Sequence, residues 1–197
     1  MHNLSMRILL LISLIFIAPL ASADPLLVGA AQDRLKEFVR YDPAYVGLDY
    51  PNGDVPSNTG VCTDVIIRSY RAAFGFDFQK AVHEDMKANF SAYPTIWGLK
   101  RPDKNIDHRR VPNLETYLQR AGKALPVTKR ASDYKAGDIV TWRLGGSLPH
   151  IGIVSDNKSR EGTPLIIHNV GAGPQEEDVL FVYELHKHFR FIPTGDK

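Results

Sequence analysis

The spacing of hydrophobic residues changes character partway along the chain. Up to residue 122, apolar side chains recur every three or four positions, which is the period of helices with one buried face. Beyond that point, β-branched and aromatic residues gather in short runs separated by turn residues, which is typical of strands. Helices followed by strands indicate an α+β fold.

The helical part of the pattern predicts four helices, over residues 24–41, 58–75, 77–89 and 114–121. In the first helix, Phe38 falls on the apolar face and is expected to be buried. The second helix has Asn58 or Thr59 as a capping residue and ends at Gly75.

The strand-like part predicts four strands, over residues 138–144, 150–156, 164–170 and 178–185. The turn segments between them are short, so neighbouring strands are expected to pair antiparallel as a meander. The predicted architecture is therefore a group of N-terminal helices packed on a C-terminal antiparallel sheet.

The N-terminal segment has the features of a secretory signal peptide: Arg7, an apolar run over residues 8–17 and "ASA" at 21–23. The run is shorter than the ~20 apolar residues of a spanning helix. We expect cleavage after Ala23, which leaves residues 24–197 as one domain; an uncleaved anchor is the alternative. A periplasmic or secreted protein that does not associate with the membrane after signal removal is predicted.

Charge and cysteine content narrow the function further. The chain has 24 Lys and Arg against 22 Asp and Glu, a balance that does not suggest a nucleic-acid-binding protein. A monomer is expected. The single cysteine, Cys62, cannot form an internal disulfide, so it is buried and inert, paired with another molecule, or reactive.

Cys62 falls in the first turn of the second predicted helix. The partial positive charge and free N–H groups of a helix N-terminus favour a thiolate, so a lowered pKa is expected there. The same N–H groups can hold a developing oxyanion. A thiol nucleophile also needs a base and a group that orients this base.

Two histidines suit these roles because each lies at one end of an apolar strand. His150 begins its strand and His168 ends the next, so antiparallel pairing would bring them side by side. Taken alone, His150 reads more simply as a hydrogen-bonded core histidine, and His168 and Asn169 could simply bond to the "GAG" turn. His186 and His188 have the spacing of a metal pair, but no third ligand is evident, so neither a metal nor a cofactor is expected.

Three segments together resemble the NlpC-type papain-like cysteine peptidases and amidases: "GVCTDVIIRSYRAAF", "AGDIVTWRLGGSLPHIGIVSD" and "PLIIHNVGAG". The chain also resembles a bacterial family of small exported proteins that carries only a domain-of-unknown-function label. The NlpC-type resemblance implies a papain-like fold with Cys62 as nucleophile, His150 as base and His168 as the orienting residue. Asn169 is the alternative third residue.

Other parts of the pattern depart from the superfamily or extend it. Thr63 and Asp64 follow the cysteine where the superfamily often has Ser after it and Asp before it, so they are candidates for substrate contact. Tyr45 is the candidate for the tyrosine that points into the site in similar enzymes. The basic residues of 100–110 either form a solvated loop or line the substrate groove, and residues 77–112 could cover the site.

The predicted function is an exported hydrolase that cleaves an amide bond in peptidoglycan or another peptide, as a stem-peptide endopeptidase or an amidase. The same three residues would also serve an acyltransferase or transpeptidase. The competing class is a non-catalytic envelope domain, in which Cys62 is buried and reacts slowly.

Overall fold

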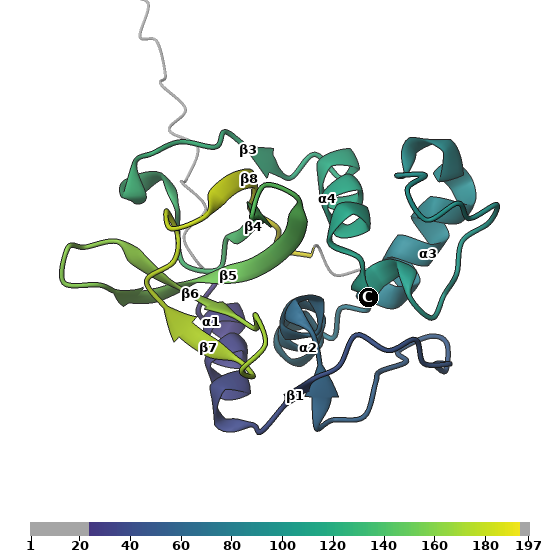
Figure 1. Cartoon of the computed structure of the whole chain (residues 1–197), viewed down its shortest axis with the longest axis horizontal. Coiled ribbons are helices and arrows are strands. Elements are labelled where there is room, and N and C mark those ends of the chain that lie inside the picture. Colours follow the sequence, from purple (N-terminus) through teal and green to yellow (C-terminus); the bar gives the residue numbers. More distant parts are fainter. Residues whose placement is uncertain (1–23, 194–197) are drawn as a thin grey trace, which may run out of the picture.

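The computed structural model describes residues 24–193, and the predicted signal peptide with its cleavage site lies outside the described residues. Within them, helices and strands form the α+β arrangement expected from the sequence (Figure 1). No helix among the described residues is long and apolar enough to cross a bilayer.

Four α-helices carry most of the N-terminal half: α1 (Pro25–Asp33), α2 (Cys62–Phe74), α3 (Phe78–Asn89) and α4 (Val111–Arg120). Short 3-10 turns add Arg34–Lys36, Phe90–Ala92, Asp107–Arg109 and Ala131–Asp133. The first helix is shorter than predicted. Phe38 lies beyond it and is 86% exposed, because the chain turns away after Lys36 to enter a short strand.

The sheets account for the remaining elements. A two-stranded parallel sheet joins β1 (Arg40–Tyr41) to β2 (Thr59–Gly60). A six-stranded antiparallel sheet has the order β3-β8-β4-β5-β6-β7. Its strands are β3 (Ala124–Leu125), β4 (Ile139–Leu144), β5 (Leu148–Lys158), β6 (Pro164–His168), β7 (Gln175–Glu177) and β8 (Glu184–Phe189).

The predicted meander is correct for β4, β5 and β6 but wrong for the fourth strand. Residues 178–183 form turns, and the strand that follows them, β8, pairs with β4 on the far side of the sheet. The apolar run in 178–183 instead covers the face of the sheet that carries Trp142. Leu180 is fully buried, and its carbonyl accepts a hydrogen bond from Trp142 Nε1.

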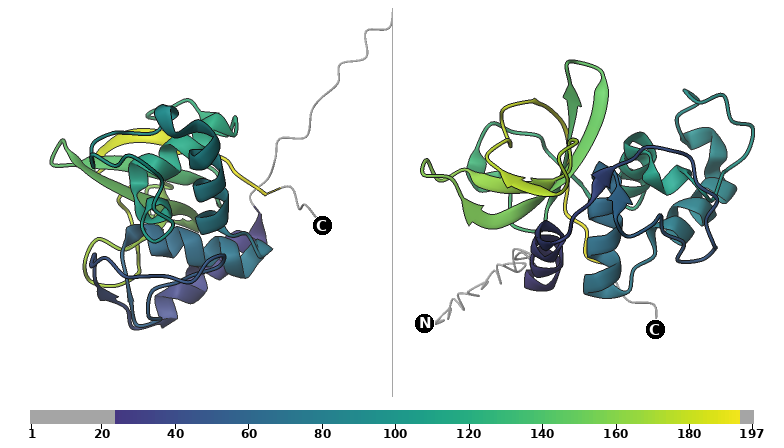
Figure 2. Two further views of the ribbon diagram at one scale, coloured as in Figure 1. Left: turned by 90° about the vertical axis from the view of Figure 1, so that its right-hand side faces the viewer. Right: turned by 60° about the horizontal axis from the view of Figure 1, so that its bottom comes forward.

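Side chains alternate across the sheet and bury two separate apolar clusters. Ile139, Ile151, Ile153 and Ile167 join the larger cluster, which the helices complete. Val140, Trp142, Val154 and Ile166 face the other side, where Tyr134 and Leu180 cover them. Figure 2 shows α1 and α2 side by side against the sheet, with α3 and α4 further along. Helix α2 is buried nearly all round over its first nine residues.

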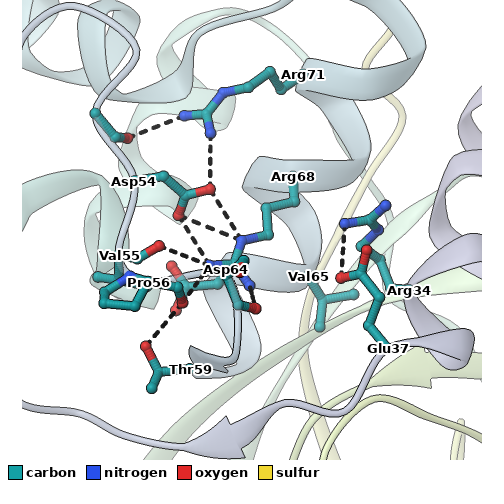
Figure 3. A network of polar contacts seen from close by, with 12 residues as sticks. Arg34, Glu37, Asp54, Val55, Pro56, Thr59, Asp64, Val65, Arg68 and Arg71 are labelled. Atoms are coloured by element: carbon teal, nitrogen blue, oxygen red, sulfur yellow. Dashed lines mark hydrogen bonds and ion pairs between the residues drawn. The ribbon is translucent and has the colours of Figure 1, made fainter.

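The two long loops are more ordered than the sequence pattern indicates. Asp54, in the loop before the cysteine, accepts hydrogen bonds from Arg68 and Arg71 of α2, as Figure 3 shows. In the second loop, the predicted solvated basic segment is wrong in its last part. Asp107–Arg109 is buried as a 3-10 turn, and α4 then begins at Val111, earlier than predicted.

Candidate active site

The start of α2 carries Cys62, and the chain reaches it through the short strand β2. The capping residue is Val61, which has no polar side chain. Asp64, in the first turn, compensates: its Oδ2 accepts from the Val61 N–H at 2.6 Å. The predicted caps are wrong because Asn58 and Thr59 lie before the helix, and the Thr59 hydroxyl donates to the carbonyl of Pro56 instead.

The Cys62 side chain meets the sheet at the peptide that joins His150 to Ile151. The backbone N–H groups of Ile151, Thr63 and Cys62 itself favour the thiolate form of the sulfur. Burial acts more strongly in the opposite direction. With Cys62 only 6% exposed and the Asp64 carboxylate near, the pKa of the thiol rises to about 12.

The expectation of a lowered cysteine pKa is therefore not met in this structure. Helix-terminus charge and N–H groups were the only terms that the sequence offered, and both have the expected sign. Desolvation depends on how α2 packs against β5, which is a tertiary property. The resting cysteine is a neutral thiol.

His150 and His168 meet across the β5–β6 pair, as predicted. The Nε2 atom of His150 lies 2.8 Å from Nδ1 of His168. By strand register, both rings lie on the face of the sheet that carries Trp142, whose ring centroid is 5.7 Å from that of His150. No hydrogen bond joins Cys62 to His150 within residues 24–193. The thiol approaches the backbone N–H that follows His150, and apo catalytic contacts are often long.

Gly152 makes the close approach of the two histidines possible. It pairs with His168 in the β5–β6 register. A Cβ atom at Gly152 would lie 2.6 Å from Ile166 Cγ2 and 3.2 Å from His168 Cβ. The glycine in "HIGIVSD" is thus required for the packing that places the His168 ring.

Glu177 is a third polar residue in this chain of contacts, and sequence reasoning missed it. Its Oε2 lies 2.9 Å from Nε2 of His168, the ring nitrogen that does not face His150. Strand β7 pairs with β6, so Glu177 reaches His168 along the sheet diagonal. The only signal in the sequence was an acidic residue in the segment interpreted as a connector.

The two histidines are held mainly in their neutral forms. Burial and, to a smaller extent, the neighbouring charge of His168 together lower the pKa of His150 to about 4. Burial also lowers the pKa of His168, while Glu177 raises it. At neutral pH, Cys62 is therefore a neutral thiol and both imidazoles are neutral.

Thr63 and Asp64 do not face an open groove, which corrects their assignment as substrate contacts. Both are buried. The Thr63 hydroxyl donates to the carbonyl of Arg109, and Asp64 accepts two hydrogen bonds from the Arg109 guanidinium, at 2.9 and 3.0 Å. These contacts attach the Asp107–Arg109 turn to the start of α2.

Tyr45 also has a different position from the one predicted. It is exposed, and its hydroxyl contacts Asp103 and Asn105. Tyr41 of β1 is the tyrosine close to the cysteine. Burial and the charges of Cys62 and Asp64 raise its pKa. Tyr41 therefore replaces Tyr45 as the candidate site tyrosine.

The remaining candidates divide between structural and unused roles. Asn169 Oδ1 accepts from the N–H of Gly171 in the following turn, so His168 and not Asn169 contacts His150. His188 Nε2 lies 2.7 Å from Asp138 Oδ2 and is not available to pair with His186. No cluster of three or more metal-binding side chains occurs among the residues that the structure describes.

Fold and site together define an α+β domain with a cysteine at a helix start that packs against an antiparallel sheet. The sheet carries two buried histidines in contact with each other, and the exposed Glu177 lies beside the second. The chain matches over residues 28–191 the family described as "Domain of unknown function (DUF1287)", and it belongs to that family. The resemblance to a domain-of-unknown-function family is thereby confirmed. The chain is also similar to the uncharacterized protein YijF of Escherichia coli (strain K12). The two are 56% identical over 172 residues, covering 87% of this chain and 83% of YijF.

Proposed function

We propose that this protein is an exported cysteine hydrolase with an NlpC-type papain-like fold, which cleaves an amide bond in peptidoglycan. The observation that carries the proposal is the 2.8 Å contact between His150 Nε2 and His168 Nδ1, next to the strand position where Cys62 meets the sheet. A base oriented by a second polar side chain beside a helix-terminal cysteine is the arrangement that thiol hydrolysis requires.

The contact with His168 decides which nitrogen of His150 acts as the base. Nε2 is occupied, so Nδ1 takes the thiol proton as Sγ attacks the carbonyl carbon. The N–H groups at the start of α2 stabilise the oxyanion of the tetrahedral intermediate. His150 then returns this proton to the amine nitrogen, the C–N bond breaks, and a thioester remains. Water, deprotonated by the same nitrogen, cleaves the thioester and restores the thiol.

The neutral resting pair has a consequence for the reaction. Because the pKa of Cys62 is raised to about 12 and that of His150 is lowered to about 4, the thiolate–imidazolium pair forms only when the site changes. Cys62 and His150 are 6% and 3% exposed, so a substrate must displace covering side chains to reach the sulfur. We assign Tyr41 to this cover because β1, which carries it, pairs with β2 directly before Cys62.

Peptidoglycan is the proposed substrate because export and the superfamily resemblance point to the cell envelope. The scissile bond is then a stem-peptide bond or the muramoyl–alanine amide. An acyl transfer to another amine would use the same three residues. The expected monomeric state and the absence of a cofactor stay predictions.

A second candidate is a non-catalytic envelope-binding domain, and the burial of Cys62 favours it. A thiol that is 6% exposed, with a pKa near 12, is what an inert packing cysteine would have. The two candidates differ in whether His150 changes the reactivity of the sulfur.

The first experiment measures the alkylation rate of Cys62 against pH, for residues 24–197 and for the His150→Ala variant. The hydrolase predicts a rate that falls when His150 is replaced, because His150 takes the thiol proton whenever the site opens to the reagent. The inert domain predicts a slow rate that rises only at high pH and is unchanged by the substitution. Digestion of purified peptidoglycan, with Cys62→Ala as control and mass spectrometry of the fragments, then identifies the bond.

A further inference from the structure

We propose that Glu177 is a positioning residue that sets the tautomers of His168 and His150, so that Nδ1 of His150 is free to accept a proton. The catalytic consequence rests on the proposed function, but the tautomers can be measured without it. Glu177 does not touch the reacting atoms and acts through His168.

The 2.8 Å contact between the two rings contains one proton, because one nitrogen must donate and the other must accept. In the first arrangement, His150 donates from Nε2 and His168 accepts at Nδ1. In the second, His168 donates from Nδ1 and His150 accepts at Nε2. For neutral rings, the first leaves a lone pair on Nδ1 of His150, and the second leaves a hydrogen there. Only the first arrangement can take the thiol proton.

The contact with Glu177 selects the first arrangement. The Glu177 carboxylate lies 2.9 Å from Nε2 of His168, which is ion-pair distance but outside the geometry of a hydrogen bond. A carboxylate never donates, and its negative charge favours a hydrogen on the nearby nitrogen over a lone pair. A neutral His168 with hydrogen on Nε2 has its lone pair on Nδ1. That lone pair requires the proton of the contact to come from His150. The second arrangement would instead place a bare Nε2 against the carboxylate oxygen.

The surroundings of His168 provide no competing ionic partner. The groups that shift its pKa are burial and Glu177 of β7, and its ring contacts are with His150 of β5 and Trp142 of β4, whose centroid lies 6.5 Å away. Trp142 directs its own N–H to the carbonyl of Leu180. The carboxylate is thus the one acidic group within ion-pair distance of His168 among the described residues.

The neighbouring Glu176 offers a matched control. It lies one residue away on the same strand, but it pairs with Ile167 and points to the opposite face. Its carboxylate accepts hydrogen bonds from Ser155 and Asn157. Neither of these residues is hydrogen-bonded to His150 or His168.

The test is two-dimensional ¹H–¹⁵N NMR of the histidine ring nitrogens at pH 7, on residues 24–197. The native protein is expected to show both His150 and His168 as Nε2–H tautomers. Glu177→Ala is expected to shift His150 toward the Nδ1–H form, while Glu176→Ala leaves it unchanged. Glu177→Gln, whose carbonyl oxygen still accepts, is expected to retain the native tautomers.

Alkylation of Cys62 in the same variants gives the chemical consequence. Glu177→Ala is expected to lower the rate about tenfold, the lower end of the range for a group that orients a functional histidine, because the carboxylate is 46% exposed. Native tautomers in Glu177→Ala, or an equal shift in Glu176→Ala, would overturn the inference. A rate that is insensitive to His150→Ala, with tautomers that still respond to Glu177, would overturn the proposed function alone.

Discussion

Two buried histidine sites lie on one face of the same sheet, and they differ in what their ring nitrogens contact. His150 and His188 both lie opposite residues of β4, namely Trp142 and Val140. Both are nearly inaccessible to solvent. A count of buried histidines would treat them as equivalent.

The His188 site is complete within itself. Nε2 lies 2.7 Å from Asp138 Oδ2, and Nδ1 lies 3.2 Å from the carbonyl of Pro126. Arg190 donates two further hydrogen bonds to Asp138. Burial alone would raise the pKa of this carboxyl, but the hydrogen bonds from His188 and Arg190 hold it below its ordinary value.

The His150 site is incomplete in comparison. One nitrogen contacts a second histidine, and the other has no hydrogen-bond partner among the described residues. The backbone of the next residue, Ile151, lies against the Cys62 thiol, whose pKa is raised. When both ring nitrogens of a histidine face oxygen acceptors, neither nitrogen is left for chemistry, and the residue serves to hold neighbouring segments together. A histidine with one ring nitrogen unassigned is suited to proton transfer.

The largest expected difference between the two sites is in activity. His150→Ala is expected to lower amide hydrolysis by about 10²–10⁴-fold, because a general base contributes that much. The fold should persist, since the substitution leaves no unpaired charge. Hydrolysis per folded molecule, with circular dichroism as the control for folding, measures it. Retained hydrolysis would place His150 with His188 as a structural residue.

The second effect is on stability and belongs to the other site. Asp138→Asn removes the charge shared by His188 and Arg190 and is expected to destabilise the protein by about 3–5 kcal/mol. Urea unfolding measures the change in the free energy of unfolding. The Cys62 alkylation rate of the folded protein should be unchanged. A slower alkylation would show that the two sites are coupled.

The third effect tests the packing that brings His168 to His150. Gly152→Ala would place a methyl group 2.6 Å from Ile166 Cγ2, and overpacking of this kind costs about 1–3 kcal/mol. Alkylation of Cys62 should also slow, because β5 and β6 must separate. Gly29→Ala, in α1 and with open space around it, is the control and should be neutral or stabilising by about 0.5–1 kcal/mol.

The smallest effect is the pH dependence of stability. His150 and His108 both have their pKa lowered by burial to about 4 in the folded protein, from an ordinary value of 6.5. The unfolded chain therefore binds protons first, so the free energy of unfolding should fall as pH drops from 6.5 to 4. Each residue contributes up to about 1.4 kcal/mol per pH unit.

Urea titrations at several pH values check this slope. His150→Gln should make the fall shallower by one residue's contribution, and His108→Gln should do the same independently. An unchanged slope in His150→Gln would mean that the His150 ring is solvated in the folded protein. The comparison of His150 with His188 as two buried histidines would then be wrong.

Local sequence pattern was enough to locate most elements and to select Cys62, His150 and His168 for the candidate site. The helical period placed α2 and α3, and the β-branched runs placed β4, β5 and β6, because one buried face imposes a period on each element. The ends of β5 and β6 then implied that His150 and His168 would meet. Alternation along β6 also separated His168 from Asn169.

Other contacts of the candidate site join segments that are far apart in the sequence, and only the tertiary structure shows them. The apolar run of 178–183 covers Trp142 rather than forming a strand, and Glu177 becomes a partner of His168 only because β7 pairs with β6. Thr63 and Asp64 are engaged by Arg109, far along the chain. The pKa of Cys62 rises because burial outweighs the helix terminus. Periodicity and caps are local, whereas desolvation and long-range hydrogen bonds depend on packing between elements, so residue type and spacing alone do not determine them.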